Sequence, residues 1–219
     1  MKFILKIINT IFSFFFIKFM NIKVIKKFSN NYGKFLYLKT HKDFELILNN
    51  ESNIFLGEIV KMILDLPINP KRILLAGENI ESKKIIKSSL SNKLQETEII
   101  TAGLMEHVDY KWNFEFPQPD IGEFDLVISQ AMIEHLIDPY KHVKDLANYL
   151  TNNGYLLIHS VLPGFEYHRH PIDSLRFYPD WFEEIAKPFR LNLEIKEKYI
   201  RDFHIFYKYK KLQNIQIIN

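Results

Sequence analysis

The amino-acid sequence predicts an α/β fold built on a doubly wound, mostly parallel β-sheet. Short, continuous apolar runs, which are typical of buried strands, alternate with helical patterns between residues 72 and 163. The segments 191–200 and 202–210 then alternate apolar and polar residues, which predicts a C-terminal antiparallel hairpin. The 219 residues suffice for one domain with a terminal extension, which we divide into an extension, 1–42, and a domain, 43–219.

The first half of the domain is expected to hold two helices and three strands. Residues 43–66 repeat apolar side chains every three or four positions, which predicts a helix that ends at a proline. The apolar run 72–77 predicts a buried strand, and a polar helix follows at about 80–92. A second strand is expected at 98–101, and the alternating stretch 109–116 indicates a third.

The second half repeats the strand–helix–strand order. Residues 124–129 and 155–163 predict two buried strands. Asp138 is the expected N-cap of the helix between them, with a proline at its first position, and the turn 152–154 is its expected end. A last helix is expected to begin near Asp180. The apolar stripe of the central helix consists of Val143, Leu146, Ala147 and Leu150.

The composition excludes several kinds of site. The chain has no cysteine, so it holds no disulfide, thiolate zinc site, iron–sulfur cluster or cysteine nucleophile. The lack of cysteine agrees with a reducing compartment, and we expect a cytoplasmic protein. With 47% hydrophobic and 25% charged residues, the chain has the composition of a folded domain rather than a disordered one.

Charge is divided unequally along the chain. Nine lysines precede Asp43, whereas all 26 acidic residues lie at or beyond that position. The domain is therefore net acidic, without the basic surface that usually binds nucleic acid. We expect no nucleic-acid partner.

The segment 1–28 is basic and amphipathic. If it is helical, Lys2 and Lys6 share a polar stripe opposite many phenylalanines and isoleucines. Its uncharged run, 7–17, is too short to span a membrane, and it lacks the small residues of a signal-peptide cleavage site. Two interpretations stay open. The helix packs on the domain or on a partner chain, or it makes a peripheral contact with the inner face of the cytoplasmic membrane.

Polar residues follow three of the predicted strands, where ligands bind in sheets of this kind. The first strand is followed by Gly77-Glu78-Asn79. The strand 124–129 is followed by QAMIEHLIDP, which contains Glu134 and His135. The strand 155–163 is followed, after a short irregular stretch, by HRHPIDSLRFYPDWF, which begins at His168.

Through these segments, residues 72–190 resemble the class I S-adenosylmethionine-dependent methyltransferases. The stretch FDLVISQAMIEHLIDPYKHVKDLANYLTNNGYLLIHSV is similar to the fourth strand, fifth helix and fifth strand of that family. The stretch HRHPIDSLRFYPDWF is similar to a subgroup met in bacterial surface-glycan pathways. The resemblance implies a Rossmann-like fold, S-adenosylmethionine as cofactor, and methyl transfer to a small-molecule or glycan acceptor.

The resemblance also implies a cofactor site. Gly77 and Glu78 would lie against the methionine and ribose end of the cofactor, and Gly103 and Leu104 under its adenosine. Residues 129–131 would line the sulfonium, and His135 would face the amino-acid end. In full, the cofactor-binding residues implied are Gly77, Glu78, Asn79, Gly103, Leu104, Ser129, Gln130, Ala131 and His135.

Two departures from the family pattern concern this cofactor site. The family has a glycine-rich turn after its first strand, whereas here only Gly77 is in place, so the turn is degenerate. The family has an acidic residue at the end of its second strand, whereas this chain reads Thr-Ala-Gly-Leu at 101–104, with Glu106 as the nearest carboxylate.

The run that begins at His168 holds the candidate catalytic residues His168, His170, Asp173 and Arg176. A histidine can take a proton from a sugar hydroxyl, Asp173 could orient it, and Arg176 could fork onto a carboxylate or phosphate. Alternatively, Asp173 and Arg176 form a structural pair. Likewise, Glu134 and His135 could hydrogen-bond locally at the start of a helix. Two histidines at this spacing without a cysteine are weak grounds for a metal site, and we expect none.

Two functional hypotheses follow. The first is an S-adenosylmethionine-dependent methyltransferase that acts on a hydroxyl, or an amine, of a glycan or glycan precursor. The second is a catalytically silent relative that serves as a binding or scaffold protein. The degenerate turn favours the second hypothesis, and the clustered polar residues at 168–176 favour the first.

Overall fold

The computed structural model describes residues 45–47, 54–90 and 93–213. The N-terminal extension expected from the sequence, with its amphipathic segment 1–28, lies outside these residues. Within the described part of the chain, no helix is both long enough and apolar enough to cross a membrane.

Eight strands of the described chain form one sheet, in the order β1-β7-β8-β6-β5-β2-β3-β4. The strands are β1 (Glu45–Ile47), β2 (Arg72–Ala76), β3 (Glu98–Gly103), β4 (Tyr110–Lys111), β5 (Phe124–Gln130), β6 (Leu150–Val161), β7 (Leu193–Arg201) and β8 (His204–Lys211). Neighbouring strands are parallel except at β8, which runs antiparallel to both β6 and β7. The predicted parallel sheet with a C-terminal antiparallel hairpin is confirmed.

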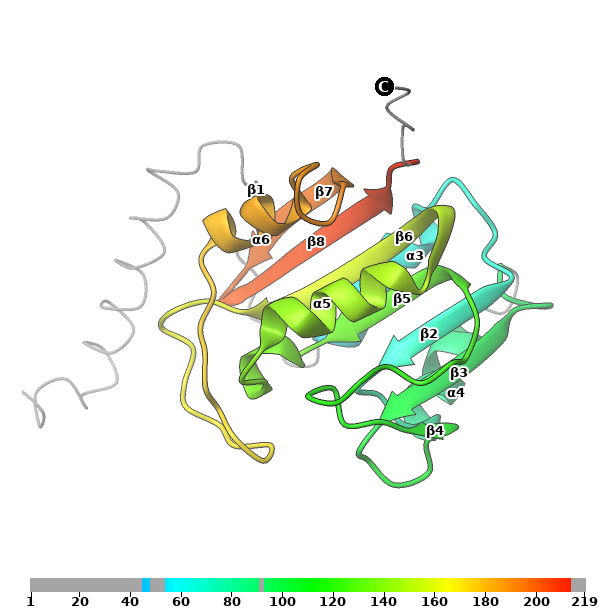
Figure 1. Ribbon diagram of the computed structural model, residues 1–219, viewed down its shortest axis with the longest axis horizontal. Helices are drawn as coiled ribbons and strands as arrows, with labels where there is room; N and C mark the ends of the chain where they lie inside the picture. The colour runs from blue at the N-terminus through cyan, green and yellow to red at the C-terminus, as the bar shows by residue number, and fades with distance from the viewer. Residues whose placement is uncertain (1–44, 48–53, 91–92, 214–219) are drawn as a thin grey trace, which may run out of the picture. The chain divides into compact units, whose positions relative to one another are not determined.

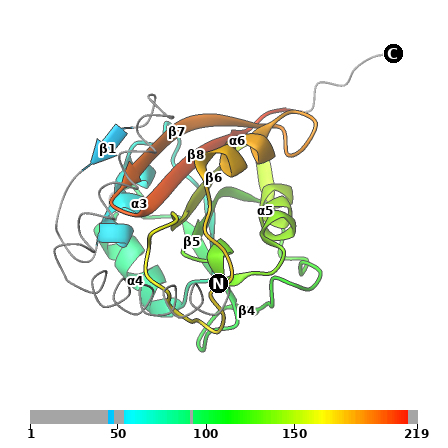
Figure 2. The same cartoon turned by 90° about the vertical axis from the view of Figure 1, so that its left-hand side faces the viewer.

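Helices cover both faces of this sheet. They are α3 (Ile54–Leu64), α4 (Ile80–Ser89), the 3₁₀ turn η1 (Ile133–His135), α5 (Pro139–Asn148) and α6 (Pro179–Ala186). Figure 1 shows α5 and α6 in front of the sheet with α3 and α4 behind it, and Figure 2 shows the sheet between the two pairs. The sheet is therefore doubly wound, as the sequence predicts.

The central strands are buried on both faces. Ile73 and Leu75 of β2 join the core cluster with Ile59 and Met62 of α3. Leu74, between them in sequence, is fully buried as well. Because side chains alternate across a strand, Leu74 faces the opposite side of the sheet. A strand covered on both faces needs a continuous apolar run, which is the pattern that predicted β2.

The start of α5 also agrees with the sequence. The Asp138 side chain accepts a hydrogen bond from the Lys141 backbone N–H at 2.9 Å, and Pro139 occupies the first turn. Val143, Leu146 and Ala147 form its buried side. The helix ends at Asn148, however, and not at 152–154 as expected. Leu150 instead starts β6 by pairing with Phe124, so its burial belongs to the sheet.

Two other expectations from the sequence were wrong in extent. Residues 43–66 were expected to form one helix, but α3 begins only at Ile54, and Glu45–Ile47 form the strand β1. These three residues pair with Tyr199–Arg201 at the edge of the sheet, so inter-strand hydrogen bonds outweigh the local helical pattern. Of the expected strand 109–116, only Tyr110–Lys111 pair with β3.

Candidate functional site

The glycines Gly77 and Gly103 bring the ends of β2 and β3 into close approach. The Gly77 N–H donates to the Ala102 carbonyl at 2.7 Å, and a Cβ on Gly103 would lie 3.4 Å from the Gly77 Cα. Gly77 has a φ of +87°, and a Cβ there would lie 2.2 Å from the Cγ of Met132, which crowds it. Only glycine fits this turn without strain. The two glycines let the strand ends approach each other closely, and the Met132 side chain packs against Gly77.

Glu78 and Asn79 are engaged by the helix that follows the turn. The Asn79 side chain accepts hydrogen bonds from the N–H groups of Glu81 and Ser82 at 3.0 and 3.2 Å, so it caps α4. The Ser82 hydroxyl donates to the Glu78 carboxylate. Burial raises the pKa of Glu78 despite this bond. Asn79 therefore has a structural role besides the cofactor contact expected of it.

The carboxylate fixed against β3 is Asp109, and not Glu106. Its Oδ2 accepts from the Thr101 N–H at 2.8 Å, from the Thr101 hydroxyl at 3.0 Å and from Lys83 at 3.0 Å. Burial opposes ionisation of Asp109, but these hydrogen bonds and the charge of Lys83 hold its pKa below the ordinary value. Glu106 and Leu104 are exposed. Asp109 was not among the residues predicted from the sequence, because only the short pairing of β3 with β4 brings it back to Thr101.

The end of β5 carries the next predicted residues. The Ser129 hydroxyl lies 3.0 Å from Nε2 of His142 in α5, and the residue is fully buried. Gln130 is partly exposed at the strand end. Ala131 has a φ of +47°, unusual for a residue with a Cβ, while its N–H donates to the His159 carbonyl at 3.0 Å. Strained backbone of this kind is frequent at functional sites.

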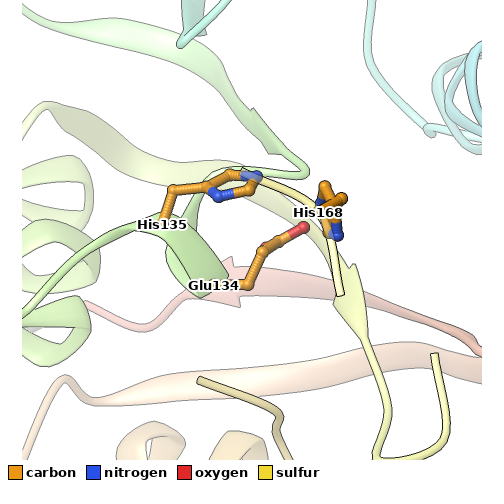
Figure 3. Close-up of side chains that lie close together, drawn as sticks. All are labelled: Glu134, His135 and His168. Atoms are coloured by element: carbon orange, nitrogen blue, oxygen red, sulfur yellow. The ribbon is translucent and has the colours of Figure 1, made fainter. Parts of the chain in front are cut away.

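Three polar side chains meet beyond the ends of β5 and β6. Glu134 and His135 of η1 face His168 from the loop 162–178, and one ligand atom of each lies within 4.8 Å of the other two (Figure 3). The rings of His135 and His168 are 4.8 Å apart and nearly perpendicular. The Ser160 hydroxyl donates to Oε2 of Glu134 at 2.8 Å, whereas the buried Oε1 has no partner among the described residues. Burial raises the pKa of Glu134.

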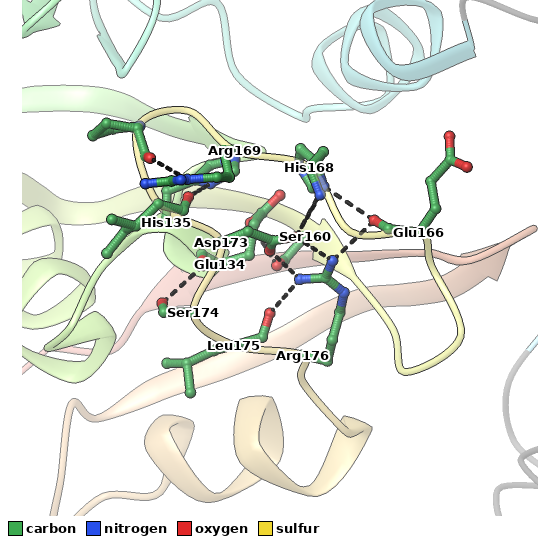
Figure 4. A network of polar contacts seen from close by, with 12 residues as sticks. Glu134, His135, Ser160, Glu166, His168, Arg169, Asp173, Ser174, Leu175 and Arg176 are labelled. Atoms are coloured by element: carbon green, nitrogen blue, oxygen red, sulfur yellow. Dashed lines mark hydrogen bonds and ion pairs between the residues drawn. The ribbon is translucent and has the colours of Figure 1, made fainter. Parts of the chain in front are cut away.

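Ser174 anchors the loop 162–178 to η1 (Figure 4). Its N–H donates to the Glu134 carbonyl at 2.9 Å, and its hydroxyl donates to the Leu136 carbonyl at 2.7 Å. These bonds bring His168 to Glu134 and His135, which are distant in sequence. All three residues were candidates from the sequence, but no sequence pattern shows that they are neighbours in the fold.

Asp173 and Arg176 form the structural pair that the sequence analysis held open. The Arg176 guanidinium donates to both oxygens of the fully buried Asp173 side chain, and to the Glu166 carbonyl at 3.0 Å. Hydrogen bonds from Arg176 hold the pKa of Asp173 well below its usual range, although burial opposes this effect. Arg176 was also expected to bind a carboxylate or phosphate of the acceptor or cofactor through two hydrogen bonds. Such a contact would compete with the bonds that Arg176 makes to Asp173 and Glu166.

The histidine that Asp173 holds is His168. The Asp173 carboxylate accepts a hydrogen bond from the backbone N–H of His168 at 2.6 Å. Its Oδ2 also lies 3.5 Å from Nδ1 of the His168 ring. His170 is exposed, with its ring 6.2 Å from that of His135. Of the two candidate catalytic histidines, only His168 is therefore held in place by side chains around it.

The chain is similar in part to known proteins. Residues 82–158 match the family model described as a methyltransferase domain. No curated protein sequence matches the chain. Among solved structures, one similar fold is an O-methyltransferase family protein from Burkholderia thailandensis, with a TM-score of 0.53 and 8% identity. The match covers 90% of this chain but only 62% of that protein.

Two further structures span nearly their whole length in the match. An S-adenosylmethionine-dependent methyltransferase from Clostridium acetobutylicum has a TM-score of 0.54 and 12% identity, covering 83% of this chain and 99% of that one. The magnesium protoporphyrin IX methyltransferase of Synechocystis, solved with S-adenosylmethionine bound, has a TM-score of 0.51 and 11% identity, covering 86% and 95%. Residues 82–158 therefore match a methyltransferase domain, and the chain has the Rossmann-like fold of the S-adenosylmethionine-dependent methyltransferases compared above.

Proposed function

We propose that this protein transfers the methyl group of S-adenosylmethionine to a hydroxyl, or an amine, of a glycan or glycan precursor. The observation that carries the proposal is the convergence of Glu134, His135 and His168 beyond the ends of β5 and β6. Met132, whose side chain crowds the cofactor turn at Gly77, comes two residues before Glu134. The polar cluster is thus adjacent to the place where a methyl donor would lie.

The chemistry of methyl transfer suits such an arrangement. The acceptor oxygen attacks the methyl carbon in line with the carbon–sulfur bond, and that bond breaks with its electron pair kept by sulfur. The acceptor proton leaves to solvent. Holding both reactants in line can lower the barrier by about 7–11 kcal/mol. In our proposal, Gly77, Glu78 and residues 129–131 hold the cofactor, while His168 and the exposed His170 face the acceptor.

A sugar-like acceptor is supported by the loop 162–178 and its surroundings. The loop sequence is similar to that of methyltransferases met in surface-glycan pathways. Tyr167 is 70% exposed and Tyr178 is 55% exposed, so both rings are accessible for stacking on sugar rings. Trp181, in contrast, packs on Phe177 with ring centroids 4.7 Å apart. We further propose that residues 1–28 hold the enzyme near a membrane-bound acceptor.

A second candidate function is a catalytically silent binding protein. It is favoured by the single glycine of the cofactor turn and by Asp109, whose Oδ2 already accepts three hydrogen bonds. A protein that no longer binds the cofactor would show this combination at the ends of β2 and β3.

Titration calorimetry with S-adenosylmethionine and S-adenosylhomocysteine separates the two functions. We expect micromolar binding of both to the full-length chain. A transfer assay with radiolabelled S-adenosylmethionine then screens nucleotide-linked and lipid-linked sugars, and we expect label in at least one of them. A folded protein that binds neither compound at millimolar concentration would favour the silent relative and overturn the proposal.

A further inference from the structure

Glu134, His135 and His168 have the composition of a metal site. Their nearest ligand atoms all lie within 4.8 Å of one another, and they come from two different elements, η1 and the loop 162–178. Two imidazoles with one carboxylate form a ligand set that binds divalent transition metals in many proteins. No metal was expected from the sequence, where His168 stood beside His170 alone, whereas the fold brings His168 to Glu134 and His135.

Hydrogen bonds to His135 and His168 favour the histidine tautomer that can bind a metal ion through Nε2. The Nδ1 of His135 lies 2.5 Å from the Ile172 carbonyl, and the Nδ1 of His168 lies 3.3 Å from the Glu166 carbonyl. A carbonyl only accepts, so these contacts favour the neutral tautomer of each ring that donates through Nδ1 and keeps its lone pair on Nε2. Histidine ligands in metal sites are oriented in this way by their outer partners.

The carboxylate supplies an independent observation. Oε2 of Glu134 is satisfied by Ser160, but the fully buried Oε1 has no hydrogen-bond partner among the described residues. A buried oxygen left unpaired is costly and therefore rare. The nearby cation cannot relieve it, because Arg176 gives its hydrogen bonds to Asp173 and to the Glu166 and Leu175 carbonyls. A metal ion between Glu134 and the two histidines would satisfy this oxygen.

We propose that Glu134, His135 and His168 bind one divalent transition-metal ion of the zinc type. Magnesium and calcium are disfavoured because they prefer a shell of oxygens, and only one carboxylate is present. A metal held at about 2.1 Å from each atom would bring the ligands to about 3.4 Å from one another, so the loop would close on the ion by roughly 1 Å. Three protein ligands leave a coordination position open to an acceptor oxygen.

The role of the metal rests on the proposed function. An acceptor hydroxyl bound to the ion would have its pKa lowered, and so would lose its proton to water more readily before it attacks the methyl group. In this arrangement, the part played by His168 in methyl transfer is to hold the metal. The binding of the metal itself does not depend on cofactor or acceptor and can be tested alone.

Metal binding can be measured on the full-length protein after removal of metals with a chelator. We expect Zn²⁺ to bind with one strong site by calorimetry, and Co²⁺ to give visible absorption bands of a site with nitrogen ligands. His168→Ala, which removes one of the three ligands, should weaken Zn²⁺ binding at least 100-fold. Ser160→Ala, which removes the partner of Glu134, should weaken it about 10- to 100-fold. His107→Ala is the matched control, since His107 is exposed and outside the cluster.

Two results would overturn the proposal: a folded protein without a strong Zn²⁺ site, or His168→Ala binding Zn²⁺ as tightly as His107→Ala does. Titration of the same samples with S-adenosylmethionine keeps the two proposals apart. Cofactor binding without a metal site would reject the metal alone, whereas a metal site without cofactor binding would reject the proposed methyl transfer.

Discussion

Two neighbouring regions at the carboxyl ends of the strands use their polar residues in opposite ways. At the ends of β2 and β3, the side chains of Asn79, Glu78 and Asp109 are engaged by a helix cap, a serine and a strand. Beyond β5 and β6, Glu134 keeps a buried oxygen without a partner among the described residues, next to His135 and His168. In the first region the polar side chains are thus taken up by the fold, whereas the second leaves a buried carboxylate oxygen beside two imidazoles. We infer that the first binds the cofactor and the second acts on the acceptor.

The largest effect should come from the second region. His168→Ala should reduce methyl transfer about 1,000-fold, because it removes a side chain that contacts the acceptor or its metal. Its affinity for S-adenosylmethionine should change less than about threefold. His170→Ala serves as the control and should lose less than about tenfold, since His170 is exposed and makes no side-chain contact with Asp173 in the described structure. Equal losses in both variants would contradict this distinction.

The next effect concerns the stability of the loop 162–178. Arg176→Leu leaves the buried Asp173 carboxylate without its ion-pair partner. We expect a loss of ~2–3 kcal/mol in the free energy of unfolding, below the 3–5 kcal/mol of a fully buried pair because Arg176 is partly exposed. Urea denaturation measures it. Lys187→Leu, which breaks the exposed pair with Glu184, should cost much less, because water screens the charges of an exposed pair. A similar cost for the two would show that the Asp173 pair does not anchor the loop.

The stability of the fold should depend on pH through the buried residue His142. Burial lowers the pKa of His142, which lies beside Ser129, to about 3. Below its ordinary value of about 6.5, the unfolded chain takes up a proton that the folded chain does not, so stability falls as pH drops toward 3. The loss between pH 7 and pH 5 should be about 2 kcal/mol from this residue. His142→Gln should remove that part of the pH dependence in urea denaturation, and an unchanged dependence would exclude His142 as its source.

The smallest effect should fall on cofactor affinity. Gly77→Ala adds a Cβ that crowds Met132 in a backbone conformation that costs about 1–2 kcal/mol for residues other than glycine. We expect the affinity for S-adenosylmethionine to fall about tenfold by calorimetry. Gly57→Ala is the control because a Cβ there meets nothing within 4 Å. Unchanged affinity in Gly77→Ala would mean that the cofactor does not lie on this turn.

Much of the fold follows from local sequence patterns. Continuous apolar runs predicted β2 and β5, alternation predicted the hairpin of β7 and β8, and Asp138 marked the start of α5. The patterns failed where strand pairing decides the structure. β1 exists because it pairs with β7, and Leu150 belongs to β6 because it pairs with Phe124.

The site was predictable in its residues and not in its pairings. The sequence identified His168, Asp173 and Arg176 as polar residues after a buried strand, and Glu134 and His135 as polar residues after another. Which of them meet depends on Ser174, whose hydrogen bonds dock the loop on η1. No periodicity records such a contact, so the link between Glu134 and His168 and the return of Asp109 to Thr101 appear only in three dimensions.

We assign the cofactor to the ends of β2 and β3 and the acceptor to the region beyond β5 and β6. The most direct test of this assignment is to titrate S-adenosylmethionine into His168→Ala and into the unchanged protein. Our account predicts binding within about threefold of the unchanged protein, in a variant whose methyl transfer falls about 1,000-fold. A loss of cofactor binding in His168→Ala, with the fold intact, would contradict the account, because it would place the cofactor in the region that we assign to the acceptor.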